Sequence, residues 1–312
     1  MVTRLKYIVM TAIMALAAAI TSCEHKDILD PGNGLHQVNL LFMWDDYPDA
    51  SPKGMTVYFF PVNSGGKIWR YDIPGRDGGP VELPAGRYDM LAFNNDLPGV
   101  AFSGMTSLRN GIASAVVRNG ISQGIGELYA AVVENIEVTP CGVCYKTPDG
   151  NEKVCRQWKV RCYPQQRFCN YRVVARNVKG ISTVRKAEVS LSGMAGRMEL
   201  ASGRLCDDQV QLAAALKVEG NSLDGSSTAF GVGPSAGKII ARINVKRTDG
   251  AVLAKEYDVT SQVTGAADPR DVTIYIDDVE IPSPGENPGG GGDVGLDVWV
   301  DGWQVITIEI TT

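Results

Sequence analysis

Cysteine is the residue type whose number and spacing offer the most chemistry in this chain. Five of the seven cysteines lie between positions 141 and 169, namely Cys141, Cys144, Cys155, Cys162 and Cys169. Cys206 follows alone, and Cys23 lies near the N-terminus. Six cysteines remain if Cys23 is set apart, and an even number favours disulfides in an exported chain. A zinc site would need a second close pair after Cys141 and Cys144, and none follows.

The disulfide with the clearest sequence basis joins Cys162 to Cys169. If the residues "PQQR" turn the chain, these two cysteines lie symmetrically about Gln165 and Gln166. They would then face each other on neighbouring strands. We therefore predict a hairpin that is bridged by this pair.

A second hairpin would join Cys144 to Cys155. These cysteines are symmetrical about the turn residues "DG", but "TPDG" also fits a three-residue turn with a glycine bulge. That turn would leave Cys155 opposite Val143 instead, so both registers stay open. Cys141 and Cys206 are the remaining disulfide candidates.

Few residues could form a catalytic site. Only His25 and His36 could serve as a histidine base for a serine or cysteine nucleophile. Adjacent acids point to opposite faces of a strand and fit turns or solvated surfaces better; the pairs are Asp45–Asp46, Asp207–Asp208 and Asp277–Asp278. The segment "GVGPSA" matches a dinucleotide loop formally, but Pro234 interrupts it and a strand pattern follows. We predict no enzyme activity, no cofactor and no metal site.

Several aromatic residues could form a platform for sugars. They are Trp44, Tyr58, Phe59, Trp69 and Trp303. At strand spacing such residues more often belong to a hydrophobic core. Core packing is therefore the favoured interpretation.

The N-terminus has the pattern of an export signal. Arg4 and Lys6 precede an apolar run over residues 7–20, which is too short to span a membrane. The residues "ITSC", positions 20–23, resemble a bacterial lipobox, in which cleavage precedes a lipid-bearing cysteine. We expect residues 1–22 to be a lipoprotein signal peptide and Cys23 to carry the lipid. A polar tether over residues 23–35 would follow.

Charge and length narrow the class of protein further. The formal net charge is -5, and loss of Arg4 and Lys6 would make it -7, which argues against a nucleic-acid partner. The remaining chain exceeds the size at which one core usually stops growing, so two domains are expected. We place them at residues 36–150 and 151–312.

Period-two apolar patterns predict an all-β protein. The segment "VNLLFMW", residues 38–44, is apolar on both faces, so it should be covered on both sides. In "KIIARINV", residues 238–245, apolar and polar residues alternate cleanly, as in a strand with one wet face. Strands are also expected over residues 128–138 and at the C-terminus in "VWVDGWQVITIEI". Residues 108–125 are less regular and fit a loop with one or two helical turns. Repeated alternation of this kind is typical of β-sandwiches.

The order of several segments resembles fimbrillin-like lipoproteins of anaerobic gut and oral bacteria. These segments run from residue 38 to the C-terminus and include "GMTVYFFPVNSGGKIWRYD", "VELPAGRYDMLAFNN", "AEVSLSGMAG", "EYDVTSQV" and "DGWQVITIEI". The resemblance implies two transthyretin-like β-sandwich domains in tandem and a structural or accessory role in type V pili. It also implies lipid attachment to the outer membrane, with the protein exposed at the cell surface.

The resemblance further implies how subunits join. In stalk subunits of this family a trypsin-like protease removes the first strand, and a strand from the next subunit fills the groove. No arginine lies between Cys23 and Arg70 here, so Lys53 is the one basic residue in the loop after the first strand. A subunit that is cleaved poorly at Lys53 would keep its lipid.

The sequence therefore predicts an anchoring or terminal pilus subunit with a role in adhesion. Its expected partners are the outer membrane through Cys23, other pilus subunits through β-strand addition, and a ligand on host or bacterial surfaces. The alternative is a surface lipoprotein that binds glycans. The cysteine cluster is not part of the family's pattern and would be a local elaboration.

Overall fold

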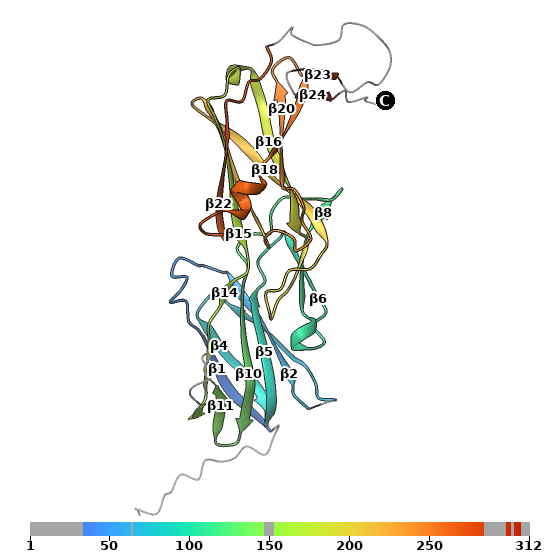
Figure 1. Ribbon diagram of the computed structural model, residues 1–312. Coiled ribbons are helices and arrows are strands. Elements are labelled where there is room, and N and C mark those ends of the chain that lie inside the picture. Colours follow the sequence, from blue (N-terminus) through green and yellow to red (C-terminus); the bar gives the residue numbers. More distant parts are fainter. Residues whose placement is uncertain (1–33, 64, 147–152, 284–297, 301–302, 307–312) are drawn as a thin grey trace, which may run out of the picture.

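The computed structural model describes residues 34–63, 65–146, 153–283, 298–300 and 303–306 (Figure 1). The chain forms an elongated molecule in which a first lobe, coloured blue to green, lies below a second lobe, coloured yellow to red. Almost all regular structure is β, as the alternating patterns predict. The described helical elements are α2 (Thr260–Thr264) and the 3-10 turns η1 (Leu108–Asn110) and η2 (Ile181–Thr183).

Two facing sheets build the first lobe. The smaller sheet has the strand order β13-β1-β4, and the larger has β12-β11-β10-β5-β2-β3, with β14 also paired to β10. Their bounds are β1 (Leu35–Phe42), β2 (Gly54–Pro61), β3 (Trp69–Pro74), β4 (Gly78–Pro84), β5 (Gly86–Asn94), β10 (Tyr129–Thr139), β11 (Gly142–Lys146), β12 (Lys153–Gln157), β13 (Lys159–Cys162) and β14 (Gln165–Gln166). The apolar faces of the two sheets meet in one core.

The second lobe is built around one long path of strands. The order is β22-β15-β19-β18-β16-β20-β21-β24-β23, and the short strand β9 pairs with β18 and β8. The bounds are β8 (Val117–Arg118), β9 (Ile121–Ser122), β15 (Cys169–Arg176), β16 (Val184–Ala195), β18 (Gln209–Glu219), β19 (Ser222–Ala229), β20 (Ile240–Arg247), β21 (Val252–Asp258), β22 (Asp271–Asp277), β23 (Val298–Val300) and β24 (Trp303–Ile306). A second core lies inside this lobe.

A third, small sheet covers the outer face of the large first-lobe sheet. It has the order β17-β7-β6, with β6 (Val100–Ser103), β7 (Ile112–Ala115) and β17 (Arg197–Glu199). Phe102 on β6 packs on Phe93 of β5 with ring centroids 4.3 Å apart, so β5 is apolar on both faces. Residues 108–125 form one 3-10 turn, η1, as expected. They also form the three short strands β7, β8 and β9, which their irregular sequence did not predict.

The two cores divide along the chain just before β15. Phe168 belongs to the first core and Tyr171 to the second, although Met198 and Phe230 reach back into the first core. The segment over residues 159–166 pairs with β1 and β10, so it continues the first lobe. The domain boundary at residue 150 stays a prediction.

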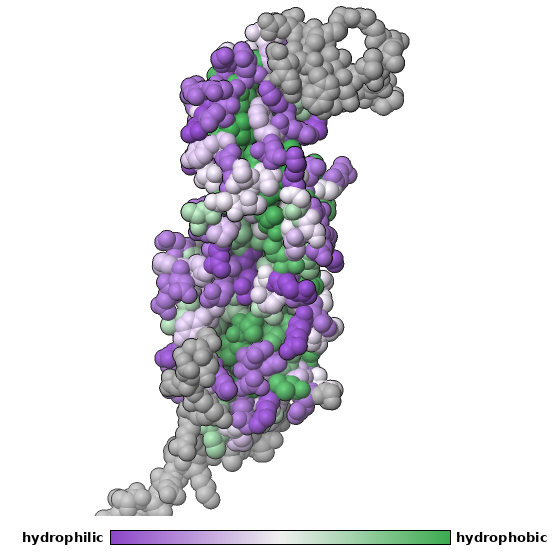
Figure 2. Space-filling model, viewed as in Figure 1, coloured by the Kyte–Doolittle hydropathy of each residue, from purple (hydrophilic) through white to green (hydrophobic). Residues whose placement is uncertain are grey.

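The surface between these elements is mostly hydrophilic (Figure 2). Hydrophilic side chains cover most of the visible face, and the widest apolar area lies on the first lobe.

The clean alternation predicted for residues 238–245 is confirmed, because Ile239, Ala241, Ile243 and Val245 are all buried. At the C-terminus the predicted single strand is a pair, β23 and β24, and β24 lies along β21.

Candidate functional site

The first strand, β1, has neighbours on both sides. It runs antiparallel to β4, with Val38 opposite Val81, and parallel to β13, with Leu40 opposite Val160. Further main-chain bonds extend the pairing past the strand, since Met43 donates its N–H to Cys162 O at 2.8 Å. A central strand with both edges paired leaves two unpaired edges behind if it is removed.

One face of β1 lies fully inside the first core. Val38 and Leu40 are completely buried, and Phe42 and Trp44 are nearly so. Burial of four such side chains is worth on the order of 10 kcal/mol before the cost of ordering the strand. The opposite face carries Leu41, which is only half-buried. The expectation of full cover on both faces is therefore wrong for β1, because the small sheet has a core on one side only.

Strand β4 approaches β1 closely at a glycine. Gly78 lies opposite Leu41 with a φ of +110°, and a Cβ added there would be 2.1 Å from Leu40 O. A side chain at this position would push the two strands apart. We define the seat of β1 as the facing edges of β4 and β13 together with the core below them.

Trp44 closes the end of the seat. Its indole Nε1–H donates to Arg76 O at 2.8 Å, and its ring meets Tyr129 edge to face at 5.3 Å between centroids. The Arg76 guanidinium lies 5.3 Å from the indole centroid. Burial beside these rings raises the pKa of Tyr129 to about 12. The polar atom of the indole is therefore satisfied while its ring fills the core.

Lys53 lies in the loop between β1 and β2 as predicted, and its side chain is exposed. Its main chain, however, is held on both sides of the residue. The Lys53 N–H donates to Asp96 Oδ2 at 2.9 Å, and Lys53 O accepts from Gly75 N at 2.8 Å. The next residue, Gly54, is buried and begins β2. Proteases cleave segments whose main chain can unfold locally. Because the main chain of Lys53 is hydrogen-bonded, the peptide bond between Lys53 and Gly54 is a poor site for cleavage.

The predicted disulfide between Cys162 and Cys169 is wrong. Both cysteines are free, and so are Cys141 and Cys206. The residues "PQQR" do not form a hairpin, because β13, β14 and β15 run onward and pair with strands of three different sheets. Cys162 is the last residue of β13 in the first lobe, whereas Cys169 is the first residue of β15 in the second lobe.

Cys144 differs from these four free cysteines because it is disulfide-bonded. Strands β11 and β12 pair with Tyr145 opposite Val154, a register that brings position 155 next to Cys144. The register then shifts by one residue towards Val143. The turn between these strands lies outside the described residues, as does the side chain of Cys155. The link from Cys144 to Cys155 therefore stays a prediction.

The free cysteines should differ widely in reactivity. Cys162 is fully buried, and burial raises the pKa of its thiol. Cys141 is exposed. Because the thiolate is the reacting form, iodoacetamide at pH 8 should label Cys141 rapidly and Cys162 only after unfolding. Peptide mapping by mass spectrometry checks this, and equal labelling of both in the native protein would contradict it.

The acid pairs lie on the surface, as predicted. Asp277 pairs with Arg176, and Asp208 pairs with Arg197. The hydrogen bond from Arg176 lowers the pKa of Asp277, which fits a surface ion pair and not a proton donor. Residues 231–236 form a loop that leads into β20, so the formal dinucleotide pattern has no helix after it. In the described ranges, no three His, Cys, Asp or Glu side chains come together as a metal site would require.

The aromatic residues mainly support the core interpretation. Phe59 and Trp44 are buried, while Tyr58 and Trp69 are half-buried and pack against the first core. The side chain of Trp303 lies outside the described side chains. The predicted signal peptide, Cys23 and residues 23–33 of the tether also lie outside the described residues, whereas Leu35 at the predicted end of the tether already belongs to β1.

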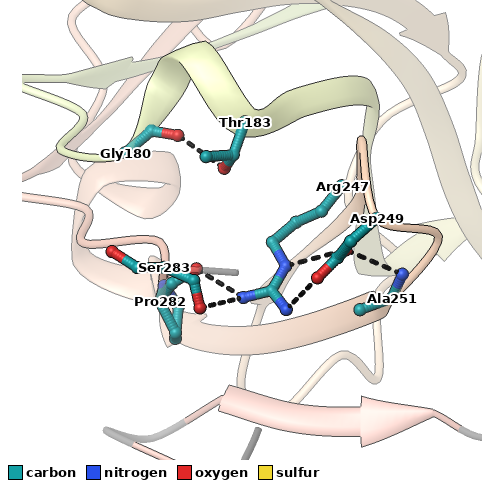
Figure 3. Close-up of polar contacts among 7 residues, drawn as sticks. All are labelled: Gly180, Thr183, Arg247, Asp249, Ala251, Pro282 and Ser283. Atoms are coloured by element: carbon teal, nitrogen blue, oxygen red, sulfur yellow. Dashed lines mark hydrogen bonds and ion pairs between the residues drawn. The ribbon is translucent and has the colours of Figure 1, made fainter. Parts of the chain in front are cut away.

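Sequence reasoning missed one buried charged residue, Arg247. In the sequence it directly precedes the turn residues "TDG", yet its side chain is fully buried (Figure 3). Its guanidinium donates to Pro282 O at 2.5 Å and Ser283 O at 2.9 Å, and it pairs with Asp249. The hydrogen bond from Arg247 lowers the pKa of Asp249. Arg247 thus ties the segment after β22, at Pro282 and Ser283, to the end of β20.

Together these features define a class of protein: an elongated all-β protein whose first strand is bound inside its own first lobe. A family model described as "Domain of unknown function (DUF5119)" matches residues 22–214, so the chain belongs to that family.

The relatives whose names are known include a fimbrial subunit and an adhesin. The "Putative fimbrium anchoring subunit Fim4B" of Bacteroides ovatus is 25% identical over 329 aligned residues, which cover 91% of this chain and 92% of the relative. A crystal structure of a "putative adhesin" from Bacteroides ovatus shares the fold, with a TM-score of 0.63, 20% identity and coverage of 85% of this chain and 98% of that one. The predicted resemblance to fimbrillin-like proteins is confirmed, and neither of these two relatives carries the name of an enzyme.

A more distant structural neighbour is "the fimbrial anchor protein Mfa2 from Porphyromonas gingivalis". Its TM-score is 0.45 at 14% identity, with coverage of 77% of this chain and 89% of that one.

Proposed function

We propose that this protein is an outer-membrane lipoprotein that anchors or completes a pilus and keeps its own first strand. The observation that carries the proposal is the closed seat of β1: both strand edges are paired and Leu40 is completely buried. A subunit in this state offers no groove to an incoming strand at that position. The name of the Bacteroides ovatus relative, an anchoring subunit, supports the same role.

The loop after β1 supports retention of the lipid. A lipid on Cys23 stays with the folded body only if the chain between residue 23 and β2 is not cut. The single basic residue of this loop, Lys53, has its N–H and C=O hydrogen-bonded. None of the helices in the described ranges reaches the length and hydropathy of a membrane span. We assign attachment to the lipid on Cys23.

Other subunits would then bind at a different strand edge. β-strand addition needs an exposed edge with unpaired main-chain groups. With β1 retained, the edges of β4 and β13 are not available for this. Adhesion and pilus assembly are therefore assigned to surfaces outside the seat of β1.

The N-terminus of the mature protein tests this proposal. We expect mass spectrometry of protein purified from the cell surface to find an acylated Cys23 with residues 23–53 still attached. A new terminus at Gly54, together with a ladder of polymers, would overturn the proposal and indicate a stalk subunit.

Two variants serve as controls for this experiment. Cys23→Ser removes the lipid attachment site and should leave an unprocessed or soluble chain in membrane fractionation. Asp96→Ala removes the acceptor of the Lys53 N–H, so trypsin should cut at Lys53 several times faster than in the wild type. Cleavage of both proteins at the same rate would show that the hydrogen bonds do not protect this loop.

A further inference from the structure

A polar cleft of about 620 Å³ lies where the two lobes meet. One wall comes from first-lobe loops that contain Pro98 and residues 123–126, and the other comes from the outer faces of β15, β19 and β22. This volume falls within the range of about 300–1,000 Å³ that small-molecule sites occupy, and such sites favour the boundary between domains. We call it the junction cleft.

The second-lobe wall presents side chains in register across three strands. Asn170 on β15 lies opposite Asp271 on β22 and opposite Thr228 on β19. In the next row, Arg172 lies opposite Ser226. Neighbouring strands are about 4.8 Å apart, so these rows form a flat grid of hydrogen-bonding groups on one face.

Most of these groups have no partner within the protein. In the described part of the chain, the side chains of Gln123, Asn170, Ser226 and Asp271 make no hydrogen bond or ion pair. Arg172 is different, because its guanidinium is bound to both oxygens of Asp224. The cleft therefore offers two amides, a hydroxyl and a carboxylate, while its one arginine is already neutralised.

The first-lobe wall is fixed and lies close to the grid. Ile125 donates its N–H to Thr228 O at 3.1 Å, and Gly126 donates its N–H to Thr228 Oγ1 at 2.9 Å. Gly124 has a φ of +106°, and a Cβ there would be 2.7 Å from Ser227 Oγ. The glycine backbone and the ring of Pro98 add a small apolar surface to the polar lining.

We propose that the junction cleft binds a neutral hexose unit of a glycan. Amides, hydroxyls and a carboxylate match a ring of hydroxyl groups, which both donate and accept, while Pro98 and the glycine backbone can contact the C–H face of the sugar. An anionic ligand is disfavoured because Arg172 is paired and Asp271 is negative. A metal ion is disfavoured because the described residues offer no cluster of three ligands.

Binding of simple glycosides to the full-length protein in detergent tests the proposal. The probes are methyl α-mannoside, methyl β-glucoside and methyl β-galactoside, with glucuronate and glucosamine as charged analogues, followed by saturation-transfer NMR and titration calorimetry. We expect at least one neutral glycoside to bind and Asn170→Ala to weaken it at least tenfold. Ser226→Trp, which fills the cleft, should abolish binding.

The matched control is Asn244→Ala. Asn244 is also an asparagine on an outer sheet face of the second lobe, and it lines a separate hollow of about 600 Å³. Neutral glycoside binding that Asn244→Ala leaves unchanged supports the junction cleft. The proposal is overturned if no neutral glycoside binds, if only glucuronate or glucosamine binds, or if Asn170→Ala and Ser226→Trp leave binding intact. These outcomes are independent of the N-terminal analysis, so this proposal and the pilus role can fail separately.

Discussion

Replacement of Leu40 by alanine is expected to lower the free energy of unfolding by about 3 kcal/mol. Leu40 is completely buried at the centre of β1, between Gly79 of β4 and Val160 of β13. The smaller side chain loses apolar burial and leaves a cavity, and paired main chains on both sides limit how far the strand can collapse into it. Urea unfolding followed by tryptophan fluorescence measures the loss.

The matched control is Leu41→Ala, one residue further along the same strand. Leu41 lies on the opposite face and is half-buried, so its replacement should cost less than about 1 kcal/mol. Hydrogen exchange should also show faster exchange across β1 in Leu40→Ala and not in Leu41→Ala. Equal effects of the two substitutions would mean that β1 does not occupy its seat in solution, and the proposed anchoring role would lose its structural basis.

Local patterns predicted the individual strands well. Alternation of apolar and polar residues is a local property, and it identified β20 because Ile239, Ala241, Ile243 and Val245 all face one core. The same logic placed β1 near its observed position. It says nothing of what covers the outer face of β5, because Phe93 packs on Phe102 of β6 and no local pattern in the sequence connects these two residues.

Pairing between distant strands could not be predicted in this way. β1 lies parallel to β13, which is far along the chain, and nothing in either sequence specifies that partner. This pairing draws Cys162 into the first lobe and away from Cys169. The two cysteines are symmetrical about "PQQR" in the sequence, but the strands that contain them pair with distant strands and not with each other.

In the candidate site, too, local features could be predicted from the sequence and tertiary contacts could not. Lys53 could be found from its residue type and position alone, but its tied main chain depends on Asp96 and Gly75. The junction cleft combines residues from the loop at position 98 with Asn170 and Asp271, and no sequence spacing connects them. Exposure, charge and strand identity are local properties, whereas a cleft between lobes is not.

Arg247→Ala is expected to destabilise the second lobe by about 3 kcal/mol, because removal of one member of a buried, hydrogen-bonded charged group leaves its partners unpaired. The carbonyls of Pro282 and Ser283 would lose their donor, and Asp249 would lose its ion pair (Figure 3). The stability of Arg247→Lys should lie between those of the wild type and Arg247→Ala. An ammonium group can reach the carbonyls but cannot form the bidentate contact with a carboxylate. Hydrogen exchange over β20, β21 and residues 279–283 should report the loss.

The contact also has a defined pH dependence. Arg247 lowers the pKa of Asp249 in the folded protein, so the stabilisation is fully present above about pH 4, the ordinary aspartate pKa, and is lost as the pH falls through the lowered folded value. The stability difference between wild type and Arg247→Ala should therefore shrink in acid. As the matched control, Arg176→Ala removes an exposed pair with Asp277 and should destabilise the protein less than Arg247→Ala does. If Arg247→Ala costs no more than this control, the segment at Pro282 is held by other contacts.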